Sequence, residues 1–253
     1  FDLITVISMF YDISEPRKFI EKTSDLLNDN GSILIEVNYA KSFFERKNVD
    51  MLGQEHLIYY FIDTFSKLIN KTSLNVNDAY LTDMNGGNIT FLISKKTHQS
   101  EQYLKLIDEE KIWLKTFDFK NFEKIVNQGF NKFKEKVISI SNTSEIKILG
   151  ASTRGALIIQ MLGLDNETIS SAVDLQTNKV GRRIPGTNID IEFDGDHDKP
   201  NYYLVMPYQF RKEIIARYTD FMKRGGCLLF YRPNQEIISY DKKAKKIIYT
   251  PII

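Results

Sequence analysis

A strand–helix–strand pattern at the start of the chain constrains the fold more than any other feature. Residues 2–8 are apolar and β-branched, which is typical of a buried parallel strand. Residues 14–16, Ser-Glu-Pro, predict a helix start, and residues 28–31, Asn-Asp-Asn-Gly, predict its end. Residues 32–37 are a second apolar run. Because short loops join them, we expect a βαβ unit with parallel strands and a right-handed crossover.

The next stretch predicts a helix and a strand pair. After a polar loop, residues 58–69 have the spacing of a helix, and residues 74–81 and 89–95 have the character of strands. The connection between these strands carries Asn-Gly-Gly at 85–87, which is a turn signal. The two strands are therefore expected to form an antiparallel hairpin.

The second half of the chain has its own α/β pattern. Residues 98–137 are charged and carry apolar stripes at helical spacing, which predicts one or two connecting helices. Further strands are predicted at 146–149, 169–174, 202–206 and 227–231, with helices ending at 162 and spanning 209–222. The sequence thus predicts two α/β halves joined by helices.

Composition excludes several classes of protein. With 253 residues, 42% hydrophobic, 26% charged and a net charge of +1, the chain is typical of a globular protein and shows no bias toward nucleic acid. No apolar run approaches the ~20 residues of a membrane span, and no secretory signal is evident. Cys227 is the single cysteine, so neither an intrachain disulfide nor a cysteine-based zinc site is expected. We expect a cytoplasmic protein without a membrane or nucleic-acid partner.

Residues 150–155, Gly-Ala-Ser-Thr-Arg-Gly, lie between a predicted strand and a predicted helix, where a dinucleotide fingerprint would lie. Ser152 replaces the glycine that lets backbone approach a pyrophosphate, and this disfavours a nicotinamide oxidoreductase. Asp174 follows at about the distance of a ribose contact. Free amides at the helix start, with Arg154 nearby, would still suit a phosphate. A tight turn without a ligand is the simpler interpretation.

A second group of candidates surrounds His56. Glu55-His56, followed by Tyr59 and Tyr60, offers a general base, a partner to orient it and phenolic donors. A histidine at a helix start is also a common surface or capping residue. The three histidines are too scattered to argue a metal site.

A basic loop follows the predicted strand at 169–174. Lys179, Arg182 and Arg183 lie close together in the sequence and would attract a phosphate. A solvated surface loop explains the same residues, since exposed charges are common.

The order of these motifs resembles that of the S-adenosylmethionine-dependent C-methyltransferases that act on nucleotide-linked keto-deoxysugars. The matching stretches are residues 1–4, 15–19, 31–37, 55–60, 85–87, 150–155, 173–174, 178–187, 207–213 and 225–226. The first three resemble the fourth and fifth strands of the S-adenosylmethionine fold. Residues 55–60 resemble a Glu-His-x-x-Tyr stretch of the family, and 85–87 its Gly-Gly turn. The later stretches resemble its C-terminal domain.

The resemblance implies an architecture. Residues 1–97 would be the second half of a class I methyltransferase sheet, which is a partial Rossmann-like sheet. Residues 98–142 would be a helical connector, and residues 143–253 a second Rossmann-like α/β domain that binds substrate. The family's glycine-rich cofactor loop, its acidic ribose contact and its zinc-binding cysteines would all precede Phe1, so we expect the chain to be the C-terminal portion of such an enzyme.

The resemblance also implies a reaction. A 4-keto sugar linked to a nucleoside diphosphate, usually dTDP, loses a proton beside the ketone, and the enolate takes the methyl group of S-adenosylmethionine. The resemblance assigns the base to His56, its neighbour to Glu55, and pocket residues to Tyr59 and Tyr60. It leaves the sugar, the methylated carbon and the oligomeric state open.

The resemblance further assigns two sets of binding residues. Cofactor contacts fall at Met9, Phe10 and Glu36. Substrate contacts fall at Asn85, Gly86, Gly87, Ser152, Arg154, Lys179 and Arg182.

Two positions depart from the family pattern. Gly53 stands where a tyrosine usually precedes the Glu-His pair, and Tyr208-Gln209 stands where Trp-His is frequent. These departures favour the alternative of a noncatalytic relative that binds a nucleotide-sugar and has lost methyl transfer.

Overall fold

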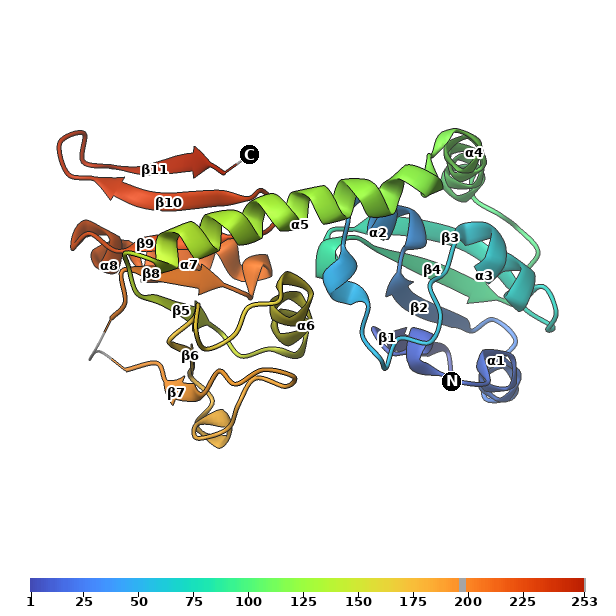
Figure 1. Cartoon of the computed structure of the whole chain (residues 1–253). Coiled ribbons are helices and arrows are strands. Elements are labelled where there is room, and N and C mark those ends of the chain that lie inside the picture. Colours follow the sequence, from blue (N-terminus) through green and yellow to red (C-terminus); the bar gives the residue numbers. More distant parts are fainter. Residues whose placement is uncertain (196–198, 253) are drawn as a thin grey trace. The chain divides into compact units, whose positions relative to one another are not determined.

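The computed structural model describes residues 1–195 and 199–252. The chain forms two compact units, Phe1–Phe119 and Lys120–Ile253, which are described separately (Figure 1). Both are mixed α/β structures with parallel strands in their sheets.

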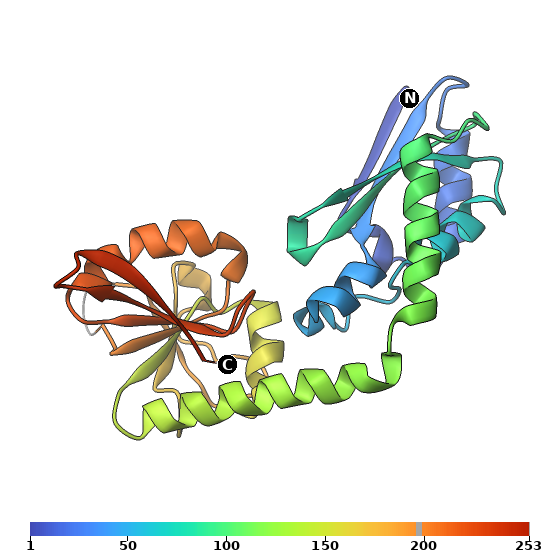
Figure 2. The same ribbon diagram turned by 90° about the horizontal axis from the view of Figure 1, so that it is seen from above.

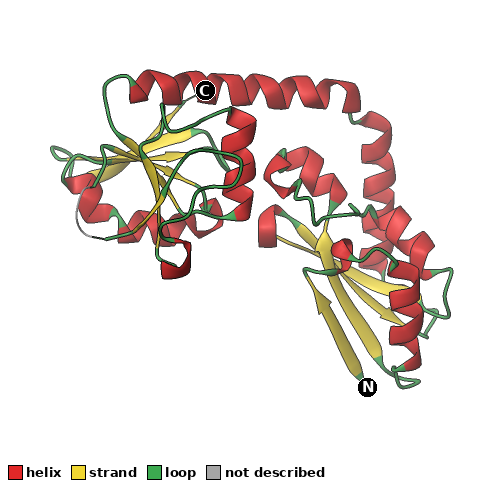
Figure 3. Cartoon of the chain, turned by 60° about the horizontal axis from the view of Figure 1, so that its bottom comes forward, coloured by secondary structure: helices red, strands yellow, loops and turns green. Residues whose placement is uncertain are grey.

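The first unit is built on a four-stranded sheet in the order β1-β2-β4-β3. Its strands are β1 (Leu3–Ile7), β2 (Ser32–Asn38), β3 (Asn75–Thr82) and β4 (Asn88–Ser94). β1 and β2 pair in parallel, and β4 pairs antiparallel with both β2 and β3. The predicted parallel pair and the predicted antiparallel hairpin are therefore confirmed. β1 lies at the sheet edge, beside the N-terminus marked in Figure 3.

Four α-helices accompany this sheet in the described part of the first unit. They are α1 (Pro16–Asp25), α2 (Ala40–Arg46), α3 (Ile62–Ile69) and α4 (Glu101–Thr116). The short turns are η1 (Phe10–Asp12), η2 (Val49–Met51) and η3 (Met84–Gly86). α4 lies against β3 (Figure 2). A core from β1 to β4, α1, α3 and α4 includes Phe65 stacked on Phe91, with ring centroids 3.9 Å apart.

In the first unit, the sequence-based boundaries were wrong around α2 and α3. The stretch predicted as a polar loop contains α2, and the helix predicted from residue 58 begins at Ile62. The reason is tertiary: the amides of Leu57 and Ile58 both donate to the Tyr11 carbonyl, at 3.0 and 3.2 Å, which holds them out of a helix. Tyr60 in turn forms an isolated bridge with Tyr39.

The second unit has a seven-stranded sheet in the order β11-β10-β9-β8-β5-β6-β7. Its strands are β5 (Ile146–Leu149), β6 (Ser171–Asp174), β7 (Ile191–Phe193), β8 (Tyr202–Val205), β9 (Cys227–Phe230), β10 (Glu236–Asp241) and β11 (Lys246–Pro251). Strands β5 to β9 are parallel, and the β10–β11 hairpin adds antiparallel to β9. The sequence analysis did not predict β7 or this hairpin.

Two helical segments of the second unit differ from the prediction: the connecting helix extends to Ser141, and the segment 209–222 is divided. The helices of this unit are α5 (Phe119–Ser141), α6 (Thr153–Leu162), α7 (Arg211–Arg217) and α8 (Thr219–Lys223), with short turns η4 (Thr177–Lys179) and η5 (Tyr208–Phe210). One helix over 209–222 was predicted, and the structure divides it into η5, α7 and α8. Residues from α7 and α8 pack with β8, β9 and β10 in one core.

Strand order defines an edge of the second sheet that would suit a ligand. From β5 the chain passes through α6 to β6 on one side, whereas β8, on the other side of β5, leads through α7 and α8 to β9. The connections thus diverge between β5 and β8. In open parallel sheets, ligands bind outside the carboxyl ends of the strands at such a divergence.

Within the described residues, no helix is both long enough and apolar enough to cross a membrane.

Candidate functional site

In the first unit, His56 and Tyr59 share one backbone acceptor. Nδ1 of His56 lies 2.7 Å from the Met51 carbonyl oxygen, and the Tyr59 hydroxyl donates to the same oxygen at 2.7 Å. A carbonyl oxygen only accepts, so Nδ1 of His56 carries the proton in this arrangement. Nε2 of the neutral ring then carries the lone pair, which is the state needed to take up a proton.

The segment around His56 is fixed by contacts with the turn that follows β1. The Leu57 and Ile58 amides donate to the Tyr11 carbonyl, and the Tyr11 ring meets the His56 ring edge-on, with centroids 4.6 Å apart. Tyr11 lies in η1, two residues beyond the exposed Met9. These contacts place His56 near the carboxyl end of β1.

Burial and nearby carboxylates keep Tyr59 protonated. Burial, and then the charges of Glu55 and Asp12, raise the pKa of Tyr59 to about 12, so its hydroxyl is a donor at neutral pH. Burial raises the pKa of Asp12, and the proximity of His56 opposes this. Glu55 is exposed, and the contact that orients Nδ1 of His56 comes from Met51. A role for Glu55 stays a prediction.

Tyr60 and Phe10 lie in the hydrophobic core. Tyr60 is 3% exposed and Phe10 is fully buried, and their rings stack with centroids 5.6 Å apart. Burial raises the pKa of Tyr60, so its hydroxyl also stays protonated. A catalytic role for Tyr60 and a cofactor contact at Phe10 stay predictions.

Buried polar groups gather at the carboxyl end of β2. Glu36 accepts hydrogen bonds from Ser8 Oγ and Asn88 Nδ2, both at 3.1 Å. Asn38, two residues further on and paired in register with Asn88, has both side-chain amide atoms buried with no hydrogen-bond partner among the described residues. Buried polar atoms in native proteins are nearly always paired with protein, water or ligand. The sequence analysis found Glu36 but missed Asn38 and Asn88.

The glycine turn at 85–87 has left-handed backbone that its glycines favour. Gly86 has φ 89° and Gly87 φ 120°. A Cβ on Gly86 would lie 2.6 Å from Asn48 Nδ2, and one on Gly87 would lie 2.7 Å from Ser42 Cβ. The close approach that these glycines permit is therefore to α2 and the residues after it. Substrate contacts at Asn85, Gly86 and Gly87 stay predictions.

In the second unit, the turn after β5 is held by side chains of this chain. Ser152 is the N-cap of α6, and its Oγ accepts from the Gly155 amide at 3.0 Å. Asp174 Oδ2 accepts from the Ala151 amide and pairs with Lys179, both at 2.9 Å. Ser152, Asp174 and Lys179 therefore stabilise the turn.

A cluster of cationic and aromatic side chains lies where the connections diverge. Arg154 Nη2 lies 2.5 Å from the Tyr208 hydroxyl, and the Arg154 and Arg232 guanidinium groups lie 5.4 and 5.6 Å from the Tyr208 ring centroid. These residues follow β5, β8 and β9 in the chain. Two guanidinium groups at this edge suit a phosphate or carboxylate. Sequence reasoning found Arg154 but gave no role to Arg232, because only strand order brings the two together.

The remaining basic residues of the predicted substrate loop are placed differently. Arg182 is exposed in the loop after η4, and Arg183 pairs with Asp190 at 2.8 Å. Across 1–195 and 199–252, no group of three or more His, Cys, Asp or Glu side chains is placed to hold a metal ion.

Comparison with known proteins identifies relatives. Residues 83–233 match the family model of the C-methyltransferase C-terminal domain. The C-methyltransferase NovU from Streptomyces niveus is 24% identical over 241 residues, which cover 92% of this chain and 57% of that protein. The chain therefore spans a little over half the length of this curated relative.

Proposed function

This chain belongs to the family of the C-methyltransferase C-terminal domain, and from that premise we propose that it takes part in S-adenosylmethionine-dependent methylation of a carbon atom. The proposed substrate is a 4-keto-deoxysugar linked to a nucleoside diphosphate, dTDP being the first candidate. The family relation supports methyl transfer. The two guanidinium groups of Arg154 and Arg232 in the second unit support a phosphate-bearing substrate.

The observation that carries the proposed chemistry is the pair of hydrogen bonds to the Met51 carbonyl. With Nδ1 of His56 protonated, Nε2 is free to accept the proton from the carbon beside the ketone. The C–H electron pair would then enter the enolate, and that carbon would form the new C–C bond to the methyl group, whose bond to the sulfonium sulfur would break so that S-adenosylhomocysteine leaves. A base within hydrogen-bond reach of the acidic C–H is the basic requirement of this step.

The residues at the carboxyl edge of β1 and β2 fit a polar cofactor. Asn38 offers an amide without a partner among the described residues, and Met9 is 41% exposed. Met9, Asn38 and Glu36 would hold S-adenosylmethionine, which when bound supplies the electrophilic methyl group. Glu36 would do so through Ser8 and Asn88, to which it is hydrogen-bonded.

The proposed substrate contacts are assigned to each unit by itself. Arg154 and Arg232 would bind the diphosphate, because paired guanidinium groups match phosphate geometry. In the first unit, Asn85, Gly86 and Gly87 are proposed as substrate contacts, and in the second unit Arg182 would add positive potential from an exposed loop. Ser152 and Lys179 would act indirectly, since they hold the turn that carries Arg154.

Proton exchange tests the role of His56 without methyl transfer. The protein is incubated with the keto-sugar nucleotide in D2O, and loss of the α-proton is followed by NMR. The native protein should catalyse exchange, and His56→Ala should abolish both exchange and methylation. His98→Ala is the matched control, because His98 is exposed on a loop and should leave both rates unchanged.

Calorimetry separates the enzyme from its noncatalytic alternative. Gly53, which stands where the family has a tyrosine, favours that alternative. Saturable binding of S-adenosylhomocysteine together with exchange would support the enzyme. Binding of the sugar nucleotide, with no exchange and no binding of S-adenosylhomocysteine, would instead support a noncatalytic nucleotide-sugar-binding relative.

A further inference from the structure

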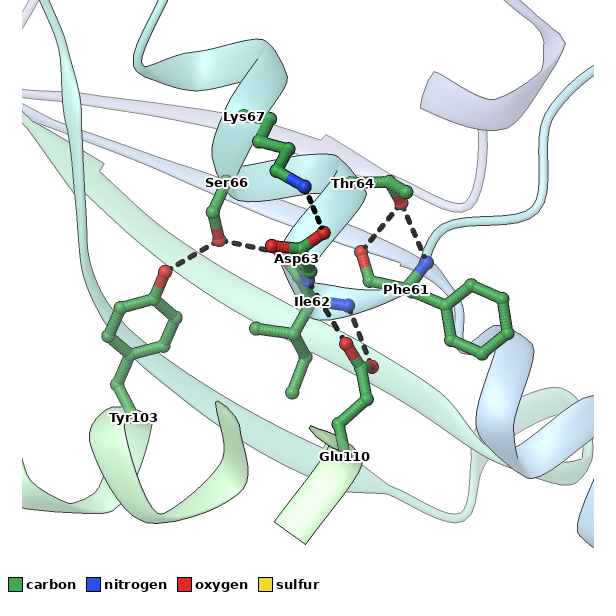
Figure 4. A network of polar contacts seen from close by, with 8 residues as sticks. All are labelled: Phe61, Ile62, Asp63, Thr64, Ser66, Lys67, Tyr103 and Glu110. Atoms are coloured by element: carbon green, nitrogen blue, oxygen red, sulfur yellow. Dashed lines mark hydrogen bonds and ion pairs between the residues drawn. The ribbon is translucent and has the colours of Figure 1, made fainter. Parts of the chain in front are cut away.

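We propose that Glu110, a buried carboxylate on α4, positions His56 by holding the start of α3. Figure 4 shows the contacts: Glu110 Oε2 accepts from the Ile62 amide at 2.8 Å, and Oε1 accepts from the Asp63 amide at 3.1 Å. Glu110 is 1% exposed. Burying a carboxylate costs free energy unless hydrogen bonds compensate for the lost water, and here two backbone amides donate those bonds.

Glu110 replaces a cap that the local sequence lacks. The N-cap of α3 is Phe61, whose side chain has no acceptor for the first amides of the helix. Thr64 satisfies the Phe61 amide at 3.0 Å, which leaves the Ile62 and Asp63 amides to the distant carboxylate. A negative charge at a helix N-terminus is also favoured by the helix dipole. The start of α3 therefore depends on α4.

The start of α3 continues directly into the candidate catalytic segment. Tyr60 bridges Tyr39, and the Tyr60 carbonyl accepts from the Ala40 amide at 2.9 Å. Between His56 and Ile62 the chain has no helix or extended strand of its own. Its path is set by the Tyr11 and Met51 carbonyls at one end, by the contacts of Tyr60 in the middle and by Glu110 at the other end. Release of the Glu110 end would let the segment shift.

Glu110 also lies near the other side of this segment. Burial, and then the charge of Glu110, raise the pKa of Tyr39, the bridge partner of Tyr60. A second contact joins the same two helices, because Ser66 Oγ and Tyr103 Oη lie 2.6 Å apart (Figure 4). This second contact lies a turn further into α3, away from His56, so it provides a comparison within the same helix pair.

The test uses the imidazole nitrogen signals of His56 in this chain, assigned with His56→Ala. Glu110→Gln keeps one carbonyl acceptor but places an NH2 group against an amide donor, so one of the two bonds is lost. We expect Glu110→Gln to shift His56 from the Nδ1-protonated form toward a mixture of tautomers. Glu109→Gln, an exposed neighbour on α4, should leave the His56 signals unchanged. Tyr103→Phe should lower stability and also leave them unchanged. Should Glu110→Gln fail to fold, Glu110→Asp keeps the charge and withdraws the carboxylate.

Kinetics of the protein give an independent measure, and this part rests on the proposed function. Glu110→Gln should lower kcat about tenfold with little change in KM, since small displacements of a reacting group have large effects on rate. Unchanged His56 signals together with a lowered melting temperature would overturn the inference and leave the proposed function standing. Shifted His56 signals, with proton exchange that survives His56→Ala, would support positioning and reject the proposed function.

Discussion

Single hydrogen bonds decide what several side chains of this protein are able to do. The Met51 carbonyl sets the tautomer of His56, and Ser152 Oγ caps α6 where a fingerprint glycine would otherwise face a pyrophosphate. In both cases the residue type was visible in the sequence. Its partner was not, because the partner's position depends on the turn that each residue occupies.

Replacing Ser152 tests its role as a helix cap. Ser152→Ala removes the acceptor of the Gly155 amide and should lower the free energy of unfolding by about 1 kcal/mol. Ser152→Asp keeps an acceptor and should retain most of the stability. Urea denaturation of the two variants measures the difference. An unchanged stability of Ser152→Ala, with weakened sugar-nucleotide binding, would instead assign the hydroxyl to the ligand.

Asp174 should make stability depend on pH. Burial raises its pKa, but hydrogen bonds from the Gln176 amide, Lys179 and the Ala151 amide outweigh burial and lower the pKa below its ordinary value of 3.8. A carboxyl group with a lowered pKa stabilises the fold above its unfolded-state pKa, and this is lost as pH falls through the folded-state value.

Asp174→Asn should therefore be less stable than the native chain at pH 7, by about 1–3 kcal/mol, and the gap should close below about pH 4. Urea denaturation of both proteins from pH 7 to below about pH 4 measures this difference in the free energy of unfolding. Asp190→Asn is the control, because its pair with Arg183 is exposed and should be worth less than about 1 kcal/mol. A gap that did not vary with pH would reject the charge as its cause.

At the scale of elements, apolar spacing placed most helices and strands, whereas tertiary contacts set their ends. The parallel pair β1–β2 and the β3–β4 hairpin follow from strand character and turn signals. The start of α3 does not, because Tyr11 and Glu110 hold the preceding residues and the first helical amides. The short α2 was missed because it lies within a stretch rich in charged residues.

Two helical glycines should respond oppositely to alanine. A Cβ on Gly155 in α6 would lie 2.8 Å from Met206 Cβ, whereas one on Gly129 in α5 would have its nearest neighbour at 3.8 Å. Gly155→Ala should cost about 1–3 kcal/mol through overpacking, and Gly129→Ala should gain about 0.5–1 kcal/mol through helix propensity. Thermal or urea denaturation of the pair checks this. A loss of stability in Gly129→Ala would mean that α5 packs more tightly than the structure indicates.

At the scale of the whole molecule, each unit has a hydrophobic core of its own. The single tryptophan, Trp113, lies in α4 within an aromatic cluster of the first unit that includes Phe61. Its fluorescence therefore reports on the first unit, while far-ultraviolet circular dichroism reports on both. Units with separate cores are expected to unfold independently unless a large interface couples them.

Gly155→Ala should thus move part of the circular dichroism transition and leave the midpoint of the tryptophan fluorescence transition in place. Gly129→Ala, also in the second unit, should move the same part of the dichroism transition in the opposite direction. Equal shifts in both signals would show that the two cores unfold as one cooperative structure.

The amino-acid sequence was enough to predict the α/β class of both units, most of their elements, and His56 and Arg154 as candidate residues. Apolar periodicity and turn residues depend on a few neighbouring positions, so they can be recognised in the sequence without knowing the fold. Only the tertiary structure brought Glu110 to the Ile62 amide and Arg232 to the Tyr208 ring. These contacts join residues that are distant along the chain or follow different strands. Strand order and helix packing create them, and neither is encoded in any local pattern.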